Sequence, residues 1–192
     1  MGYRFNRQQR SRREPVTSHL LDNIGCVADA IDDFHGRMSH IQYVFENGIV
    51  RDGIAVNAKE EVARLLHSDE MQFALNRAGD LIESWLNTDA GEIKNLFSYY
   101  WPKRYRGDSL QICEAGKYLD ERADEMRQKL TELKNFSNQL NSGMADETLL
   151  GLGFELAFGL SHSKVYISSV SSEIVRALKS LHRENQKSHL RE

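Results

Sequence analysis

The stretch LLDNIGCVADAIDDFHGRMSHIQYVF, residues 20–45, decides the fold of this chain. Its apolar seam recurs at alternating steps of four and three positions, with members Leu20, Ile24, Val27, Ile31, Phe34, Met38, Ile41 and Phe45. That spacing places the seam along one stripe of an α-helix. The stretch therefore predicts a long helix that starts near Thr17 or Ser18, after Pro15, and ends at about Asn47.

Two later segments repeat this pattern. A helix predicted from Asp108 or Ser109 to about Gly143 has a seam of Ile112, Gly116, Leu119, Ala123, Met126, Leu130, Leu133 and Leu140. A last helix, which Asp146 is predicted to cap and which reaches about Arg183, has two rows, Leu149, Leu156, Val170 and Ala177, and Leu160, Ile167, Ile174 and Leu181. Glycines interrupt the start of the last helix, which indicates either a kink or close packing against a neighbour, at Gly151, Gly153 and Gly159.

Shorter elements are predicted between the long helices. Asp52-Gly53 within residues 49–56 suits a tight hairpin turn, although an irregular loop is equally compatible. Asn57 with Glu60 resembles a capping box at the start of a short helix. Further helices are expected from Ser68, carrying Phe73, Ala74, Leu81, Ile82, Trp85 and Leu86, and from Thr88 or Asp89, with Ile93, Leu96, Phe97 and Tyr100.

These patterns predict an all-α fold, an elongated helical bundle of three long heptad-patterned helices with a cluster of shorter helices over residues 57–101. A small β-hairpin at 49–56 is the one expected exception. The predicted organisation is a flexible basic arm at 1–15, a single helical-bundle domain at 16–183 and a polar tail at 184–192. The first seam could pair two copies of the chain, but the two later seams favour packing within one chain.

Composition bounds the class of protein. Of 192 residues, 40% are hydrophobic, which suffices for a core without disulfides. Cys26 and Cys113 have no metal-ligand spacing, so reduced thiols in a cytoplasmic protein are expected. No apolar run is long enough to cross a bilayer and no signal peptide is visible, so no membrane partner is expected. No sequence pattern indicates a cofactor or a metal.

Basic charge is concentrated at the amino terminus. The net charge is −3, yet the first thirteen residues contain no acid and hold +5, which leaves −8 for the remainder. The five arginines of this arm are Arg4, Arg7, Arg10, Arg12 and Arg13. Such an arm could attract nucleic-acid phosphates, pair with carboxylates of a protein partner, or only solvate the chain.

A second candidate surface is the segment YYWPKRYR, residues 99–106. It combines aromatic and cationic side chains, which are Tyr99, Tyr100, Trp101, Lys103, Arg104, Tyr105 and Arg106. These could stack nucleic-acid bases and hold phosphates. The same residue types anchor protein–protein interfaces, and they could also simply close the end of the bundle.

Arg183-x5-His189 resembles the Arg-x(4–6)-His spacing of HEPN-type helical ribonucleases. In that family the arginine and histidine act on the RNA phosphate and the 2′-hydroxyl, so the resemblance implies a ribonuclease. It covers seven residues, and Glu184 stands where the family usually has a small polar residue.

Other polar groupings have simpler explanations. Glu155, His162 and Tyr166 share one helix face and could transfer a proton, but half-exposed residues beside the seam look the same. Asp32-x-x-His35, with His40 nearby, has metal-ligand spacing but no second copy. Gly151-x-Gly153 lacks the preceding strand and the lysine of a phosphate loop.

The function that these features favour is a non-enzymatic adaptor or assembly subunit that docks protein partners, with membership of a nucleic-acid-handling complex left open. Direct nucleic-acid binding through the arm and the 99–106 segment is the first alternative, and a HEPN-like ribonuclease is the second. The expected partner is a protein, with nucleic acid and self-association left open.

Overall fold

The computed structural model describes residues 13–89, 91 and 109–189. The fold is all-α apart from one small hairpin. In chain order the elements are α2 (Arg13–Asn47), β1 (Ile49–Arg51), β2 (Ile54–Val56), α3 (Ala58–Leu66), α4 (Asp69–Ser84), a π-helical turn η1 (Trp85–Asp89), α6 (Ser109–Leu140) and α7 (Asp146–His189).

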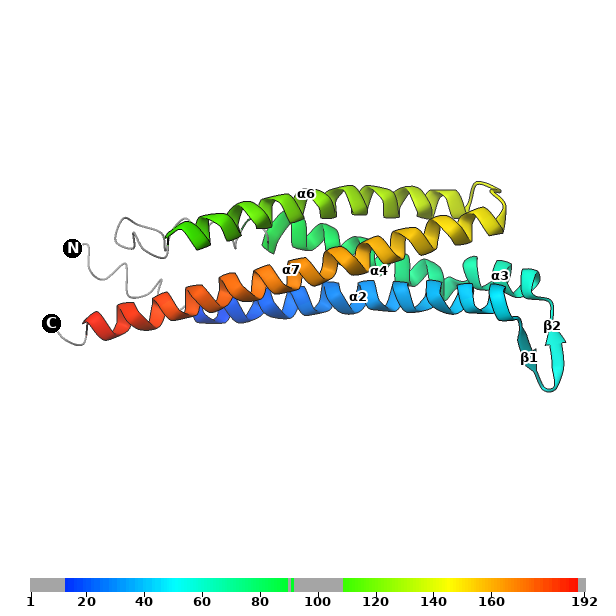
Figure 1. Ribbon diagram of the computed structural model, residues 1–192, viewed down its shortest axis with the longest axis horizontal. Helices are drawn as coiled ribbons and strands as arrows, with labels where there is room; N and C mark the ends of the chain where they lie inside the picture. The colour runs from blue at the N-terminus through cyan, green and yellow to red at the C-terminus, as the bar shows by residue number, and fades with distance from the viewer. Residues whose placement is uncertain (1–12, 90, 92–108, 190–192) are drawn as a thin grey trace.

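The helices form an elongated bundle whose successive members run in opposite directions (Figure 1). Helix α2 lies along α7, and α6 lies along the other side of α7. Helix α4 contacts both α2 and α6 and so closes the ring of four. The hairpin and α3 lie at one end of the bundle, whereas α2 begins and α7 ends near the opposite end.

This arrangement confirms the all-α bundle and the three long helices, and it adds α4 as a fourth member. The sequence prediction placed residues 57–101 as a cluster that caps or flanks the bundle. Instead α4 packs lengthwise, because Met71, Leu75, Ala78 and Ile82 form a buried stripe along it. Phe73, one of the apolar residues that this helix was predicted to carry, is 62% exposed.

The first seam is buried as predicted over most of its length. Ile31, Phe34 and Met38 are fully buried, and Ile41 is nearly so. The pattern fails at its end, where Phe45 is 39% exposed and its neighbour Val44 is fully buried. Burial at this end therefore follows the neighbouring elements that cover α2 rather than the heptad spacing.

Several predicted helix ends differ from the structure. Helix α2 begins at Arg13, so the last three residues assigned to the arm are helical and neither Thr17 nor Ser18 is its cap. Pro15 is tolerated in this first turn because the first helical N–H groups have no intrahelical acceptor. Helix α7 begins at Asp146, which is helical rather than a cap, and continues through most of the predicted tail to His189.

Two predicted caps are confirmed. The Asn57 side chain accepts a hydrogen bond from the Lys59 amide and donates one to Glu60, and α3 follows. The Ser68 side chain accepts from the Met71 amide at the start of α4. The predicted start of a third short helix falls on the π-helical turn, and the four apolar residues assigned to that helix lie outside the described residues.

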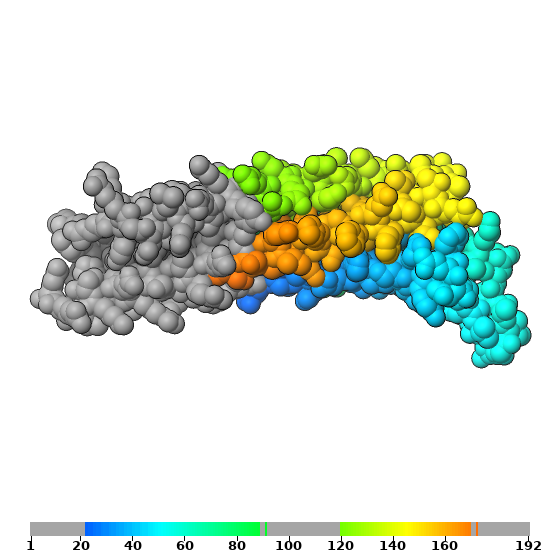
Figure 2. All heavy atoms as spheres, viewed as in Figure 1, coloured from blue at the N-terminus to red at the C-terminus, as the bar shows by residue number. Residues whose placement is uncertain are grey.

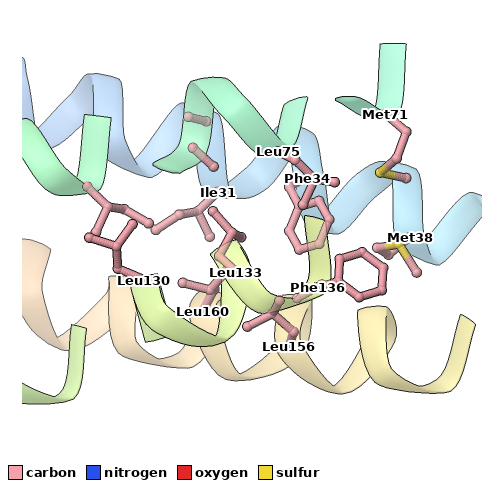
Figure 3. Packing of buried hydrophobic residues seen from close by; sticks show 14 of the residues in the cluster. Ile31, Phe34, Met38, Met71, Leu75, Leu130, Leu133, Phe136, Leu156 and Leu160 are labelled. Carbon is pink, nitrogen blue, oxygen red and sulfur yellow. The ribbon is translucent and has the colours of Figure 1, made fainter. Parts of the chain in front are cut away.

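Side chains from all four bundle helices meet in one continuous core (Figure 3). Phe34 of α2 lies against Phe136 of α6, with ring centroids 6.3 Å apart. Phe136 is 2% exposed and was not assigned to the predicted seam of its helix. The heptad row of α7 also contains a buried polar residue, Ser163, whose hydroxyl donates to Glu125 of α6 at 2.5 Å.

Close packing, one of the two predicted explanations for the α7 glycines, applies to Gly153. At Gly153 a Cβ atom would lie 2.6 Å from Met38 Cε and 2.6 Å from Phe136 Cζ, closer than van der Waals contact allows. Gly153 therefore permits close packing of α7 against α2 and α6. Gly151 has no such neighbour within 4 Å, so close packing does not explain it.

Candidate docking surface at the hairpin end

The hairpin is built around the turn that the sequence predicted. Asp52 and Gly53 have φ values of 52° and 78°, as a two-residue hairpin turn requires. The strands pair antiparallel with Ile49 opposite Val56 and Arg51 opposite Ile54. Gly48, with φ 68°, ends α2 and lets the chain turn away from the helix axis.

The two faces of the hairpin differ. Successive side chains of a strand point to opposite faces, so Ile49 and Arg51 share one face and Val50 lies on the other. Ile49 packs against the edge of the core. Val50 and its partner Ala55 are both exposed, so the face turned away from the core is apolar and uncovered.

Several large apolar side chains are exposed in this part of the chain. Four of these residues together are called the hairpin end: Tyr43, Phe45, Val50 and Ile54. Their side chains are 61%, 39%, 67% and 71% exposed. They fall within twelve consecutive residues, and Figure 2 shows the hairpin projecting beyond the outline of the bundle. Exposed apolar residues that gather in this way are typical of protein interaction sites.

A single carboxylate ties the hairpin to α3. Glu61, with a side chain 4% exposed, accepts a hydrogen bond from Arg51 Nη2 of β1 at 2.6 Å. It also accepts two from Arg64 of α3, at 2.9 Å from Nε and 2.8 Å from Nη2. These bonds, that from Arg64 above all, hold the pKa of Glu61 below its usual value. Both arginines reach into solvent, so water screens the three charges and limits their effect on stability.

One ion pair and one histidine–carboxylate contact link α3 and the residue that caps its end to the start of α7. Lys59 Nζ lies 2.9 Å from Glu147, and His67 Nε2 lies 3.0 Å from Asp146. The Glu147 carboxylate raises the pKa of Lys59 by accepting a hydrogen bond from it. The base on which the hairpin stands is therefore linked to the bundle through polar contacts as well as through buried Val62 and Leu66.

The sequence-predicted binding residues cannot be placed relative to this end. The arm residues Arg4, Arg7, Arg10 and Arg12 lie outside the described residues, and Arg13 begins α2 with its side chain outside the described part. The same holds for the whole aromatic and basic segment, that is Tyr99, Tyr100, Trp101, Lys103, Arg104, Tyr105 and Arg106. Both predicted surfaces stay predictions.

The polar grouping on α7 is a set of surface contacts. His162 lies edge-on to Tyr166 with ring centroids 4.9 Å apart, and the Arg122 guanidinium lies 5.1 Å from the Tyr166 ring centroid. Glu155 is exposed. Arg183 and His189, on which the ribonuclease resemblance rests, both belong to the helical backbone of α7.

The α2 residues with metal-ligand spacing, Asp32, His35 and His40, do not form a metal site in the described part of the chain. Asp32 forms an ion pair with Lys164 of α7. Within the described ranges, no group of three or more histidine, cysteine or acidic side chains is placed to hold a metal ion. Among the helices that the structure describes, none is long and apolar enough to cross a membrane.

The sequence did not predict the hairpin anchor, which is Glu61 with its two partners Arg51 and Arg64. Glu61 and Arg64 have the i, i+3 spacing of a helical ion pair, which is a detectable signal. Arg51 joins them only because the hairpin folds back over α3, and no local pattern reports that contact. The exposure of Val50 and Ile54 was equally invisible, since an apolar strand alone does not show which face is covered.

No known protein-family model matches the chain, and searches of curated proteins and of solved structures found no significant match.

Proposed function

We propose that this protein is a non-enzymatic adaptor or assembly subunit that docks a protein partner through the hairpin end. The bundle acts as a rigid spacer, and the hairpin presents an apolar tip that inserts into an apolar depression on the partner. Burial of apolar surface supplies the free energy of such a contact.

One observation carries the proposal. Val50 and Ile54 keep about two thirds of their surface exposed on an element that projects from the bundle. Val50 lies on the face turned away from the core, and Ile54, opposite Arg51 on the other face, is still 71% exposed, so neither side chain adds much to the core. The Glu61 anchor supports the proposal, since it holds the hairpin against α3 before any partner arrives. Pre-ordering of this kind lowers the entropy lost on binding.

The test compares full-length protein with a variant carrying Val50→Thr and Ile54→Thr. Threonine keeps the β-branched shape that strands favour and removes much of the apolar character. Partners are captured from the native cell, identified, purified and titrated against both proteins. We expect the double variant to weaken binding by about tenfold or more, as for residues central to an interface.

Phe73→Gln is the matched control, because Phe73 is equally exposed but lies on α4. Its affinity for the partner should equal that of the unmodified protein. Equal affinity of the hairpin variant would refute docking at this end. Recovery of nucleic acid alone, with binding that falls steeply as salt rises, would instead favour the arm and the 99–106 segment.

A further inference from the structure

A groove opens on the side of the bundle, between α2 and the junction of α3 with α4. Its volume is about 320 Å³, at the lower end for a binding pocket. Apolar side chains that line it come from all three helices, namely Ile41, Leu65 and Met71. It is separate from the four residues of the hairpin end, none of which lines it.

Carboxylates form the other part of the groove lining. Asp32 and Asp33 both line it, and each has a single cation close by. Arg37 Nε lies 3.3 Å from Asp33 Oδ1 without the alignment of a hydrogen bond, so this pair is loose. A carboxylate offers about four acceptor directions, and one cation leaves acceptor capacity on each.

Further acids surround the groove. Asp29 is exposed one turn before Asp32 on α2. Asp69 and Glu70 directly follow Ser68, which lines the groove at the start of α4. Counting these, five carboxylates lie in or beside the groove against three cations, which are Arg37, Lys164 and Arg64, the last acting on Glu70. The local field therefore favours a cationic occupant.

Gly36 is part of the groove lining. It lies inside α2, and a Cβ atom there would meet nothing within 4 Å. Glycine lowers helix stability, and no contact within the described residues requires it at this position. A larger side chain would extend into the space that the groove now leaves free.

We propose that this groove binds an arginine or lysine side chain on a basic segment of a partner protein. The apolar residues would cover the aliphatic stem, and the Asp32 and Asp33 carboxylates would accept hydrogen bonds from the charged head. Arginine and lysine bury their stems against apolar surface in this way while their charge pairs with acids. This contact goes beyond the proposed hairpin docking and does not depend on it.

The test measures the fluorescence anisotropy of a labelled seven-residue peptide of alternating glycine and arginine at low salt. Full-length protein is compared with Gly36→Leu, which fills the groove without changing its charge. Gly25→Leu is the matched control, because Gly25 is also an exposed α2 glycine with free space around it but does not line the groove.

We expect Gly36→Leu to weaken peptide binding by about tenfold, and Gly25→Leu to change it by less than about twofold. Asp33→Asn should weaken binding by about threefold, since an exposed ion pair contributes little. A peptide of glutamate and glycine should not bind. Equal binding by the two leucine variants would overturn the proposal, as would equal binding of the acidic peptide.

A last experiment tests whether the arginines of the chain's own amino-terminal segment occupy the groove. In a full-length variant with Arg4→Ser, Arg7→Ser and Arg10→Ser, peptide affinity should stay unchanged if the groove is free for a partner. A several-fold gain in affinity would mean that the amino-terminal segment competes for the groove, and would overturn assignment to a partner protein. Failure of the hairpin variant to lose its partner would leave all of these results unaffected, so the two proposals can fail separately.

Discussion

The middle of the bundle and the hairpin end treat apolar side chains in opposite ways. Around Gly153, Met38 and Phe136 pack so closely that a single added carbon would overlap both. Twelve residues after Met38, beyond the end of α2, Val50 extends into solvent, as does Ile54. In the first region apolar surface stabilises the fold, and in the second it is left available. This difference separates scaffold from candidate interface without reference to any motif.

The largest expected effect is in the middle of the bundle. Phe34→Ala should lower the free energy of unfolding by about 3–5 kcal/mol, because it removes a fully buried ring and leaves a cavity. Phe73→Ala, at an exposed position, should change it by less than about 0.5 kcal/mol. Urea denaturation followed by circular dichroism measures both. Similar losses in the two variants would contradict the assigned core.

An intermediate effect is expected from overfilling the same region. Gly153→Val should destabilise the protein by about 1–3 kcal/mol, because Met38 and Phe136 must move to admit the side chain. Gly151 lies two residues earlier on α7, and a Cβ atom there would meet nothing within 4 Å. Gly151→Val should therefore change the free energy of unfolding by less than about 0.5 kcal/mol. The same denaturation experiment compares them. If Gly153→Val proved harmless, α7 could not approach α2 and α6 as closely as the structure has it.

The smallest effect is expected at the hairpin anchor. Its bonds from Arg64 and Arg51 lower the Glu61 pKa in the folded state, so they stabilise the fold above the ordinary glutamate value of about 4.3. That contribution is lost as pH falls through the lowered pKa. Carboxyl NMR should show Glu61 titrating below pH 4.3, and Arg64→Gln should raise its midpoint. A midpoint at or above 4.3 in the unmodified protein would exclude the anchor.

The sequence determined much of the scaffold. The four-three spacing from Leu20 to Ile41 was sufficient for a long helix and its buried stripe, because helical periodicity is a local property. Asp52-Gly53 specified its turn for the same reason, since few residues accept positive φ. Asn57 and Ser68 specified caps through bonds that span two or three residues.

Only the tertiary structure decided how these elements meet. It made α4 a bundle member, placed Phe73 in solvent, and buried Val44 in place of Phe45, because burial depends on which neighbour faces each stripe. It joined Arg51 to Glu61 and brought Leu65 and Met71 to Asp33, residues that no local pattern connects. Helical period and turn chemistry act over a few residues, whereas a groove and an exposed hairpin arise from contacts between segments far apart in the chain.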